Sequence, residues 1–361
     1  MQKLVSPESN VYLSDDFKAD LKEILESLPH TKLFILTDDF AFTHLLPTIE
    51  ESFVIPKNHI HQIKHTDHHK DIESLTSVWQ FLADNGADRK SILINLGGGM
   101  PCDLGGFAAS TFKRGIRFIN IPTTLLAQVD ASVGGKTGIN FNGFKNEIGV
   151  FQHATAVLVN INLLASLDLK NIKSGYAEMI KHALIDTEVC FEKIANFNLE
   201  TYGTKEFSMT DLKELVWESI QIKERFVQQD PKEQGIRKAL NLGHTVGHAF
   251  ESMALKQNKD LLHGYAVAFG VIVELYLSHI YCKFPFKLVE ETRRLIDNMY
   301  GTFAFTPADY EILYEYMTHD KKNEADKINF TLLKSIGNIQ IDQNCSKEDI
   351  FMALNYYLKV V

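Results

Sequence analysis

The chain has 361 residues, of which 45% are apolar and 23% charged, a composition typical of a globular protein with two domains. Its formal net charge of -9 argues against nucleic acid or an anionic membrane as the main partner, so any anion must be bound by a local basic pocket. Scattered cysteines, an N-terminus without a signal-peptide core and a longest apolar stretch (Ala266 to Val273) too short to cross a bilayer predict a cytoplasmic protein.

The first half of the chain alternates short apolar runs with amphipathic segments. The runs with the pattern of buried strands are Lys32 to Thr37, Ser91 to Leu96, Arg117 to Ile121 and Ala156 to Asn160. Strands that alternate with helices are typical of a parallel sheet. We therefore predict an α/β domain with a parallel, Rossmann-like sheet over residues 1–167.

The second half has mainly helical periodicity from Ser174 onward. Helices are expected at Asp211 to Gln228, Ala239 to Met253, Tyr265 to Cys282 and Pro307 to Met317, with a closing helix from Ser346. One strand-like run, Lys327 to Leu333, precedes the closing helix. These patterns predict a mainly α-helical domain over residues 168–361.

Three successive glycines, Gly97, Gly98 and Gly99, follow an apolar strand and precede a helix-like segment. Their backbone amides could bind a phosphate or pyrophosphate, although a tight strand-to-helix turn needs the same residues. The dinucleotide fingerprint would place a glycine at Cys102, so the motif is weak alone. Gly135-Lys136-Thr137 is similar to the end of a Walker loop, but the required first glycine falls on Asp130, which excludes a P-loop.

A polar, glycine-rich stretch runs from Pro122 to Gly138, and Lys145-Asn146 follows it. Its many functional groups favour a functional loop. The second half adds Lys223 and a series at four-residue spacing, Glu233, Arg237 and Asn241. On a helix this series would present an acid, a base and an amide along one face, although a solvated face with ion pairs gives the same pattern. Asp320-Lys321-Lys322 has the pattern of a charged turn.

Histidines four residues apart, His244 and His248, would share one helix face, and His263 follows downstream. Glu178 offers a carboxylate from another helix. Nitrogen and oxygen ligands of this kind, with one position left open, are typical of a catalytic zinc site, whereas two histidines alone more often pack in a core. The zincin signature is absent, because Thr245 and Val246 lie between the histidines.

Other histidines are weaker candidates for metal binding. His182, one turn after Glu178, is a rival fourth ligand or a core residue. A polar, surface-like segment also holds a histidine cluster without a paired acid or cysteine framework, which makes a metal site there the less favoured interpretation. Its members are His59, His61, His65, His68 and His69.

Taken together, these motifs resemble the 3-dehydroquinate synthase family, in order and at the family's spacing from about residue 35 to residue 333. The segments that carry the resemblance are Gly97-Gly-Gly-x-x-x-Asp103, Arg114-Gly115, Pro122-Thr-Thr-Leu-Leu, Asp130-x-Ser-x-Gly-Gly-Lys136-Thr, Lys145-Asn146, Ala177-Glu178-x-Ile-Lys181 and Asn241-x-Gly-His244-x-x-Gly-His248-x-x-Glu251. The resemblance implies an NAD-binding α/β domain followed by a mainly α-helical, metal-binding domain.

The resemblance also implies roles for single residues. The ligands of one divalent metal, zinc or cobalt, would be Glu178, His244 and His263, with His248 in the substrate site. The NAD contacts would be Asp38, Asp67, Lys70, Gly97, Gly98, Gly99, Asp103, Thr123 and Thr124, with Asp130 and Lys145 shared with the substrate site. The other substrate residues would be Lys136, Asn146, Lys223, Glu233, Arg237, Asn241, Lys322 and, from the partner subunit of a homodimer, Arg114.

This sequence departs from the family pattern at two places. Asp67 stands where the family usually has glutamate, and His153 stands where it commonly has proline. The first departure bears on a ribose contact and the second on local backbone geometry. Either Lys321 or Lys322 matches a phosphate-binding lysine, and Lys322 is the better match.

The implied activity is conversion of 3-deoxy-D-arabino-heptulosonate 7-phosphate to 3-dehydroquinate and phosphate, in the shikimate pathway. The reaction would proceed through transient oxidation by NAD, phosphate elimination, re-reduction and intramolecular aldol closure, in this order. Alternatives are another sugar-phosphate cyclase, a metal-dependent polyol dehydrogenase and a catalytically inactive NAD- or metal-binding module. Lys223 with Arg237 favours a substrate that carries a carboxylate, and therefore the synthase.

Overall fold

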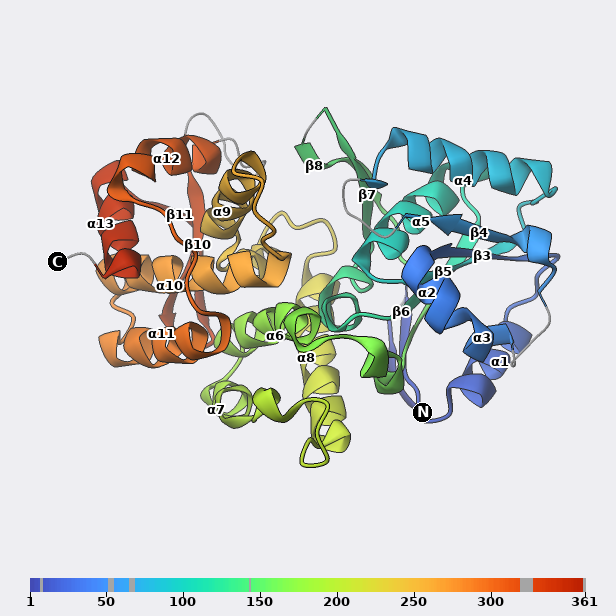
Figure 1. Cartoon of the computed structure of the whole chain (residues 1–361), viewed down its shortest axis with the longest axis horizontal. Helices are drawn as coiled ribbons and strands as arrows, with labels where there is room; N and C mark the ends of the chain where they lie inside the picture. Colours follow the sequence, from blue (N-terminus) through green and yellow to red (C-terminus); the bar gives the residue numbers. More distant parts are fainter. Residues whose placement is uncertain (7–8, 51–54, 65–68, 143, 319–326, 360–361) are drawn as a thin grey trace. The chain divides into compact units, whose positions relative to one another are not determined.

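The computed structural model describes residues 1–6, 9–50, 55–64, 69–142, 144–318 and 327–359. These residues form two compact units (Figure 1). The first contains Met1–Asp168 and Met209–Glu224, and the second contains Leu169–Ser208 and Arg225–Val361. A single domain boundary after residue 167 stays a prediction. In the structure, the segment Met209–Glu224 also belongs to the first unit, although it comes later in the sequence.

A seven-stranded sheet forms the centre of the first unit, in the order β1-β2-β9-β6-β5-β3-β4. The strands are β1 (Gln2–Val5), β2 (Asn10–Leu13), β3 (Leu33–Asp38), β4 (Ile60–Ile63), β5 (Ile92–Gly97), β6 (Arg117–Pro122) and β9 (Ala156–Val159). Only β1 and β2 pair antiparallel, and the other pairs are parallel. The predicted parallel α/β sheet is therefore confirmed.

Helices cover both faces of this sheet because its strands are apolar on both sides. The helices are α1 (Phe17–Ser27), α2 (Asp39–His44), α3 (Leu46–Glu50), α4 (Ile72–Asp84) and α5 (Gly99–Thr111). Ile35 and Ile94 belong to one core cluster with Leu21 of α1. The neighbouring residue Asn95 points the other way, toward Gly105 of α5. This alternation along the strands places α1 and α5 on opposite faces.

The polar stretch that was interpreted as a functional loop is more ordered than expected. It contains a π-helical turn, η4 (Ala127–Ala131), and then strand β7 (Lys136–Phe141), which pairs antiparallel with β8 (Phe144–Phe151). The loop interpretation is wrong for this second part. Alternation of apolar and polar residues is the usual sequence signal of such a hairpin. In this segment, glycines and additional polar residues interrupt that alternation.

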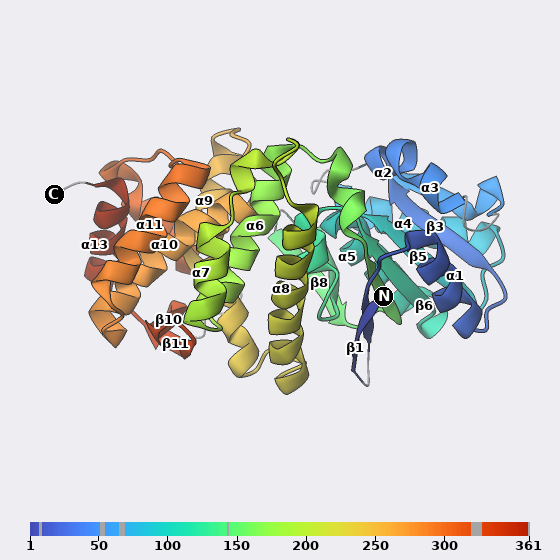
Figure 2. The same cartoon turned by 90° about the horizontal axis from the view of Figure 1, so that it is seen from below.

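The second unit is mainly helical, as predicted. It contains α6 (Leu169–Leu184), α7 (Glu188–Asn196), the end of α8 (Met209–Gln229), α9 (His244–Lys256), α10 (His263–Cys282), α11 (Phe286–Tyr300), α12 (Tyr310–Thr318) and α13 (Lys347–Leu358). An antiparallel hairpin, β10 (Asn329–Ser335) and β11 (Asn338–Asn344), completes it. Helix α10 packs against α6, α9, α11, α13 and β10, and Figure 2 shows α11 beside it.

Helix α10 is buried because it is apolar around most of its circumference. Among the described residues it is the one helix long and apolar enough to span a bilayer, with a mean hydropathy of 1.5 in a window that is 67% buried. The sequence argument that the apolar stretch Ala266 to Val273 is too short to cross a bilayer does not hold. The helix continues through Gly270 and is 20 residues long. Its burial explains the apolar composition, as for the core helix of a soluble protein.

One predicted helix begins later than expected. Residues 236–241 form a 3₁₀ helix, η7 (Ile236–Asn241), and the α-helix starts only at His244. Gly243 adopts a left-handed conformation with φ 81°, and Glu233 lies in a left-handed turn with φ 57°. The expectation that Glu233, Arg237 and Asn241 share one face of an α-helix is therefore wrong, because these backbone conformations interrupt it.

Candidate functional site

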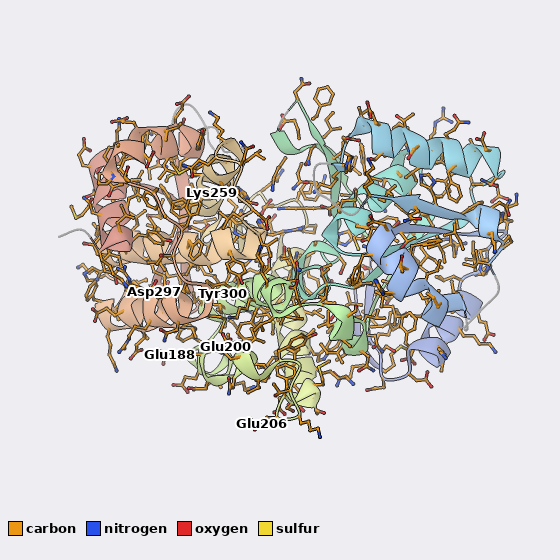
Figure 3. The ribbon with its side chains drawn as sticks, in the orientation of Figure 1. Glu188, Glu200, Glu206, Lys259, Asp297 and Tyr300 are labelled. Carbon is orange, nitrogen blue, oxygen red and sulfur yellow. The ribbon has the colours of Figure 1, made fainter. Side chains whose placement is uncertain are left out.

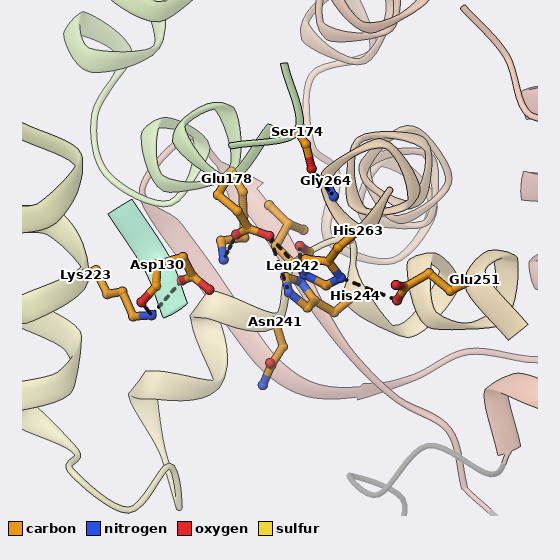
Figure 4. A network of polar contacts seen from close by, with 12 residues as sticks. Asp130, Ser174, Glu178, Lys223, Asn241, Leu242, His244, Glu251, His263 and Gly264 are labelled. Atoms are coloured by element: carbon orange, nitrogen blue, oxygen red, sulfur yellow. Dashed lines mark hydrogen bonds and ion pairs between the residues drawn. The ribbon is translucent and has the colours of Figure 1, made fainter. Parts of the chain in front are cut away.

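Three helices bring the predicted metal ligands together in the second unit. Glu178 lies in α6, while His244 and His263 are the first residues of α9 and α10. Glu178 Oε1 lies 3.6 Å from Nε2 of His244 and 3.4 Å from Nε2 of His263 (Figure 4). One potential ligand atom from each residue lies within 4.8 Å of the other two. The donor set matches the nitrogen and oxygen ligands that zinc and similar cations prefer.

The Glu178 carboxylate is fully buried, and the positive groups around it compensate its charge. Burial raises its pKa, but Lys181, His244 and His263 hold that pKa well below the ordinary value. Lys181 forms an ion pair with Oε2, whereas Oε1 accepts no well-formed hydrogen bond within the described residues. A buried carboxylate oxygen that faces two imidazole nitrogens is suited to a divalent cation.

His263 is held from its other side by a second carboxylate. Its Nδ1 lies 3.4 Å from Glu251 Oε2, and its Nε2 faces Glu178. Burial lowers the pKa of His263, but Glu251 and Glu178 raise it to about 10. The two carboxylates therefore favour a positive charge at this imidazole, either an added proton or a cation bound at Nε2.

The other two candidate histidines lie near this group. His248 follows His244 by one turn of α9, with the ring centroids 5.4 Å apart, and forms a second possible group with Glu251 and His263. His182 is fully buried in α6. Their assignment as residues that do not bind the metal stays a prediction.

The histidine cluster near residue 60 is explained by packing where the structure describes it. His59 Nδ1 lies 3.0 Å from the carbonyl oxygen of Leu33. His61 stacks on Phe81 with centroids 4.9 Å apart, and its Nε2 lies 3.0 Å from Ser77 Oγ. His65 and His68 lie outside the described residues.

Close contacts fix the helix that carries Glu178. The backbone N–H of Gly264 donates to Ser174 Oγ at 3.2 Å, so the start of α10 touches α6. A Cβ atom on Gly264 would lie 1.8 Å from the Ser174 carbonyl oxygen, so only glycine fits there. Near the start of α6, Lys173 pairs with Glu200 at 2.6 Å, and its carbonyl accepts from Tyr300 Oη at 3.0 Å. Figure 3 labels Glu200 and Tyr300 among the side chains of the second unit.

In the first unit, the glycine turn lies at the carboxyl ends of neighbouring strands. Gly97 ends β5, and a Cβ atom on it would lie 2.8 Å from Asp38 Oδ2 at the end of β3. The Thr123 N–H after β6 donates to the Gly97 carbonyl at 2.9 Å, and Thr124 Oγ1 accepts from the Ala127 N–H at 3.1 Å. This edge is where open parallel sheets bind nucleotides.

The start of helix α5 is suited to bind an anion. Its N-cap, Gly98, provides no side-chain cap, and Gly99 opens the helix. The first backbone amides of a helix carry partial positive charge and need acceptors. Behind this turn, Lys70 Nζ pairs with Asp103 Oδ2 at 3.0 Å, which places those two predicted NAD contacts together. Asp67 lies outside the described residues.

Two predicted substrate residues of the first unit form a partly buried pair. Lys223 Nζ, on α8, lies 2.7 Å from Asp130 Oδ1 and also contacts the Asp130 carbonyl oxygen. On the β7–β8 hairpin, Lys136, Lys145 and Asn146 have exposed side chains. Arg114 is also exposed and has φ 68°.

In the second unit, the segment before α9 fixes Glu233, Arg237 and Asn241 without the expected α-helix. Asn241 Nδ2 donates to Glu233 Oε1 at 3.0 Å, and the Arg237 guanidinium donates to the Pro231 carbonyl oxygen at 2.7 Å. Asp230 holds this loop by accepting the N–H groups of Gln234, Gly235 and Arg237 at 3.0, 2.6 and 3.1 Å. Lys321 and Lys322 lie outside the described residues.

Sequence reasoning missed several residues that shape these groups. Asp230 orders the loop before α9, Glu251 holds His263, and Glu274 accepts backbone N–H groups at the start of α9. The Asp230-Pro231 pair is a turn signal that was available in the sequence. No comparable local signal marks Glu274, since its contacts are made 31 residues away in sequence.

We predict that Gly264→Ala destabilises the second unit by roughly 1–3 kcal/mol, because the new methyl group overpacks the α6–α10 contact. It should also weaken metal binding by displacing His263 from Glu178. Urea unfolding and a zinc titration measure the two effects. Ser174→Ala is the matched control, since it removes the hydroxyl but keeps the space. Wild-type zinc affinity in Gly264→Ala would contradict the prediction.

Comparison with known proteins places this arrangement in one family. Residues 60–174 match the model of the 3-dehydroquinate synthase N-terminal domain, and residues 175–323 match that of the C-terminal domain. A 3-dehydroquinate synthase of Parabacteroides distasonis is 48% identical over 350 residues, which are 97% of this chain and 98% of the relative.

Solved structures share the fold. A 2-epi-5-epi-valiolone synthase from Streptomyces hygroscopicus subsp. jinggangensis, with NAD+ and Zn2+ bound, has a TM-score of 0.85 and 21% identity, and covers 99% of both chains. A 2-deoxy-scyllo-inosose synthase, complexed with carbaglucose-6-phosphate, NAD+ and Co2+, has a TM-score of 0.81 and 21% identity over 96% of both chains.

Proposed function

We propose roles for individual residues from one premise: the chain belongs to the 3-dehydroquinate synthase family. It is an enzyme whose reaction converts 3-deoxy-D-arabino-heptulosonate 7-phosphate to 3-dehydroquinate and phosphate, a step of the shikimate pathway. The observation that carries this function is the 48% identity with a synthase of that name over 97% of the chain.

One divalent cation, zinc or cobalt, is held by Glu178, His244 and His263. The support is the buried Glu178 Oε1, which lacks a well-formed hydrogen bond and faces both imidazole Nε2 atoms. When bound, the cation lowers the pKa of a coordinated hydroxyl group. Lys181 compensates the second carboxylate oxygen, so that Glu178 remains ionised.

NAD is bound at the carboxyl edge of the sheet in the first unit. The Gly97–Gly99 turn and the uncapped start of α5 bind its pyrophosphate, and the remaining contacts come from Asp38, Asp67, Lys70, Asp103, Thr123, Thr124, Asp130 and Lys145. When bound, NAD accepts a hydride from the substrate and returns it before the cycle ends. The Lys70–Asp103 pair fixes the lysine ammonium beside this turn.

Charged residues bind the two anionic ends of the substrate. Lys223 and Arg237 bind the carboxylate, because guanidinium and ammonium groups donate charge-assisted hydrogen bonds to it. Lys136, Asn146, His248 and Lys322 bind the phosphate and stabilise its negative charge as the carbon–oxygen bond breaks. Glu233 and Asn241, already hydrogen-bonded to each other, orient substrate hydroxyl groups.

The substrate carboxylate distinguishes this function from the alternatives. The two solved cyclases are 21% identical and share the fold alone. Lys223 and Arg237 are buried cations that can donate charge-assisted hydrogen bonds to a carboxylate, which favours the synthase over a cyclase of sugar phosphates that lack a carboxylate. A polyol dehydrogenase needs no phosphate-binding residues.

The reaction predicts a particular balance of products. Phosphate should be released over many turnovers with catalytic NAD, and 3-dehydroquinate should form in equal amount, because the hydride is borrowed and returned. A coupled phosphate assay with absorbance at 340 nm for NADH measures both. NADH formation equal to substrate consumption would instead favour a polyol dehydrogenase.

The metal assignment predicts different behaviour for the two histidines of α9. His244→Ala should lose zinc or cobalt and most activity, because a ligand is removed. His248→Ala should keep the metal and raise the KM, because it binds substrate phosphate. Metal content after dialysis and steady-state kinetics distinguish the variants. The assignment fails if His244→Ala retains one metal ion per chain.

We also propose that the enzyme is a cytoplasmic homodimer in which Arg114 reaches the phosphate site of the partner. The support is the exposed side chain of Arg114 and the family role of the matching arginine. In an isologous dimer each subunit would complete the other's site.

Mixing two inactive variants, Arg114→Ala and Lys223→Ala, tests this shared site. If Arg114 acts on the partner, each mixed dimer contains one intact site, and random reassociation restores roughly a quarter of wild-type activity. The same mixture stays inactive if Arg114 acts within its own subunit. Subunit exchange is checked independently with differently tagged chains.

A further inference from the structure

The two helices that carry the metal-binding histidines also carry buried glutamates outside the proposed ligand set. Glu251 lies in α9, two turns after His244, and Glu274 lies in α10, three turns after His263. Both side chains are buried, and that of Glu274 has no solvent exposure. Burial of a carboxylate costs free energy unless hydrogen bonds or cations compensate it.

Glu274 caps the helix that begins with His244. Its Oε2 accepts the backbone N–H of Gly243 at 2.6 Å, and its Oε1 accepts that of Val246 at 3.2 Å. Helix α9 has no side-chain cap of its own, because its N-cap residue is Gly243. A negative charge at a helix N-terminus is favourable, so Glu274 supplies from α10 the cap that α9 lacks.

Close packing of the two helices makes this cap possible. A Cβ atom on Gly270, one turn before Glu274, would lie 2.0 Å from the Gly243 carbonyl oxygen. Helix α10 therefore touches the backbone just before His244. With two N–H groups on either side of His244 fixed by one carboxylate, the start of α9 has little freedom to move.

Glu251 lies in α9 and contacts His263, the proposed metal ligand at the start of α10. Its Oε2 lies 3.4 Å from His263 Nδ1, while His263 Nε2 faces Glu178 Oε1 at 3.4 Å. A carboxylate at Nδ1 keeps the proton on that nitrogen and leaves the Nε2 lone pair available to a metal. It also fixes the plane of the ring.

We propose that Glu251 and Glu274 are positioning residues of the metal centre, each extending from one histidine-bearing helix to hold the ligand of the other. The proposal rests on the metal site of the proposed function. Glu251 of α9 contacts His263, and Glu274 of α10 binds the backbone on both sides of His244. The positions of both histidines are therefore fixed before a cation binds. Ligands that are already in place bind a cation more tightly, because less conformational entropy is lost on binding.

Zinc affinity of the full-length, metal-stripped protein tests the proposal, measured by competition with a chromophoric chelator. Glu251→Gln should bind zinc roughly 10-fold more weakly than wild type, the usual effect of losing a partner of a metal-bound histidine. Glu274→Gln should bind about 5-fold more weakly, because an amide accepts only one of the two N–H groups. Cobalt-loaded variants should show shifted visible absorption bands.

Ser278→Ala is the matched control for general damage to α10. Ser278 is fully buried one turn after Glu274, donates to the Glu274 carbonyl at 2.7 Å and accepts from the Leu333 N–H at 3.0 Å. Its loss should lower the Tm without changing zinc affinity. Glu274→Asp is a second variant in case Glu274→Gln does not fold, and its shorter side chain should also weaken binding.

The outcomes separate this inference from the proposed function. Wild-type zinc affinity in both glutamate variants would overturn the positioning roles, and so would an equal loss of affinity in Ser278→Ala. Complete loss of the metal in Glu251→Gln would make Glu251 a ligand and not a positioning residue. Zinc binding by His244→Ala equal to wild type would overturn the metal site itself, and the inference with it.

Discussion

The buried carboxylate of Glu178 is the constraint on which the helical unit depends. A charge without solvent must be compensated, and Lys181, His244 and His263 provide that compensation from three different helices. Their convergence explains the backbone around them, because α6 and α10 approach so closely that only glycine fits at Gly264. The apolar helix α10 can remain in the core because its polar groups, Glu274 and Ser278, are hydrogen-bonded to neighbouring backbone.

A second constraint organises the first unit. Parallel strands place their carboxyl ends at one edge, so that Asp38 at the end of β3, Gly97 at the end of β5 and Thr123 after β6 meet although they are distant in sequence. The close approach of Gly97 to Asp38 leaves no space for a side chain, and the uncapped start of α5 leaves amides for an anion. Cofactor binding in the proposed function uses this geometry directly.

The chemistry assigned to the enzyme requires positive charge that is fixed before substrate binds. Lys223 is fixed by Asp130, and Arg237 is fixed by the Pro231 carbonyl and the loop that Asp230 orders. These contacts limit the rotamers of two long side chains, so less conformational entropy would be lost in the proposed binding of a carboxylate. The proposed metal ligands His244 and His263 are restrained by the same principle, through Glu274 and Glu251.

Local patterns in the sequence determined the strands β3, β5, β6 and β9 and the helices α8 and α10, because strand and helix periodicity are short-range properties. The residue pattern made His244, His248, His263 and Glu178 candidates for metal binding, and the family resemblance reduced this set to Glu178, His244 and His263, which the structure brings together. They could not determine where α9 begins, since the left-handed turn at Gly243 depends on contact with Gly270 of another helix. Nor could they show that the substrate loop is held by Asp230 or that β7 pairs with β8. The cap from Glu274 was decided only by tertiary structure, because its partners are 28 and 31 residues distant in sequence and only the packing of α10 on α9 brings them within hydrogen-bonding distance.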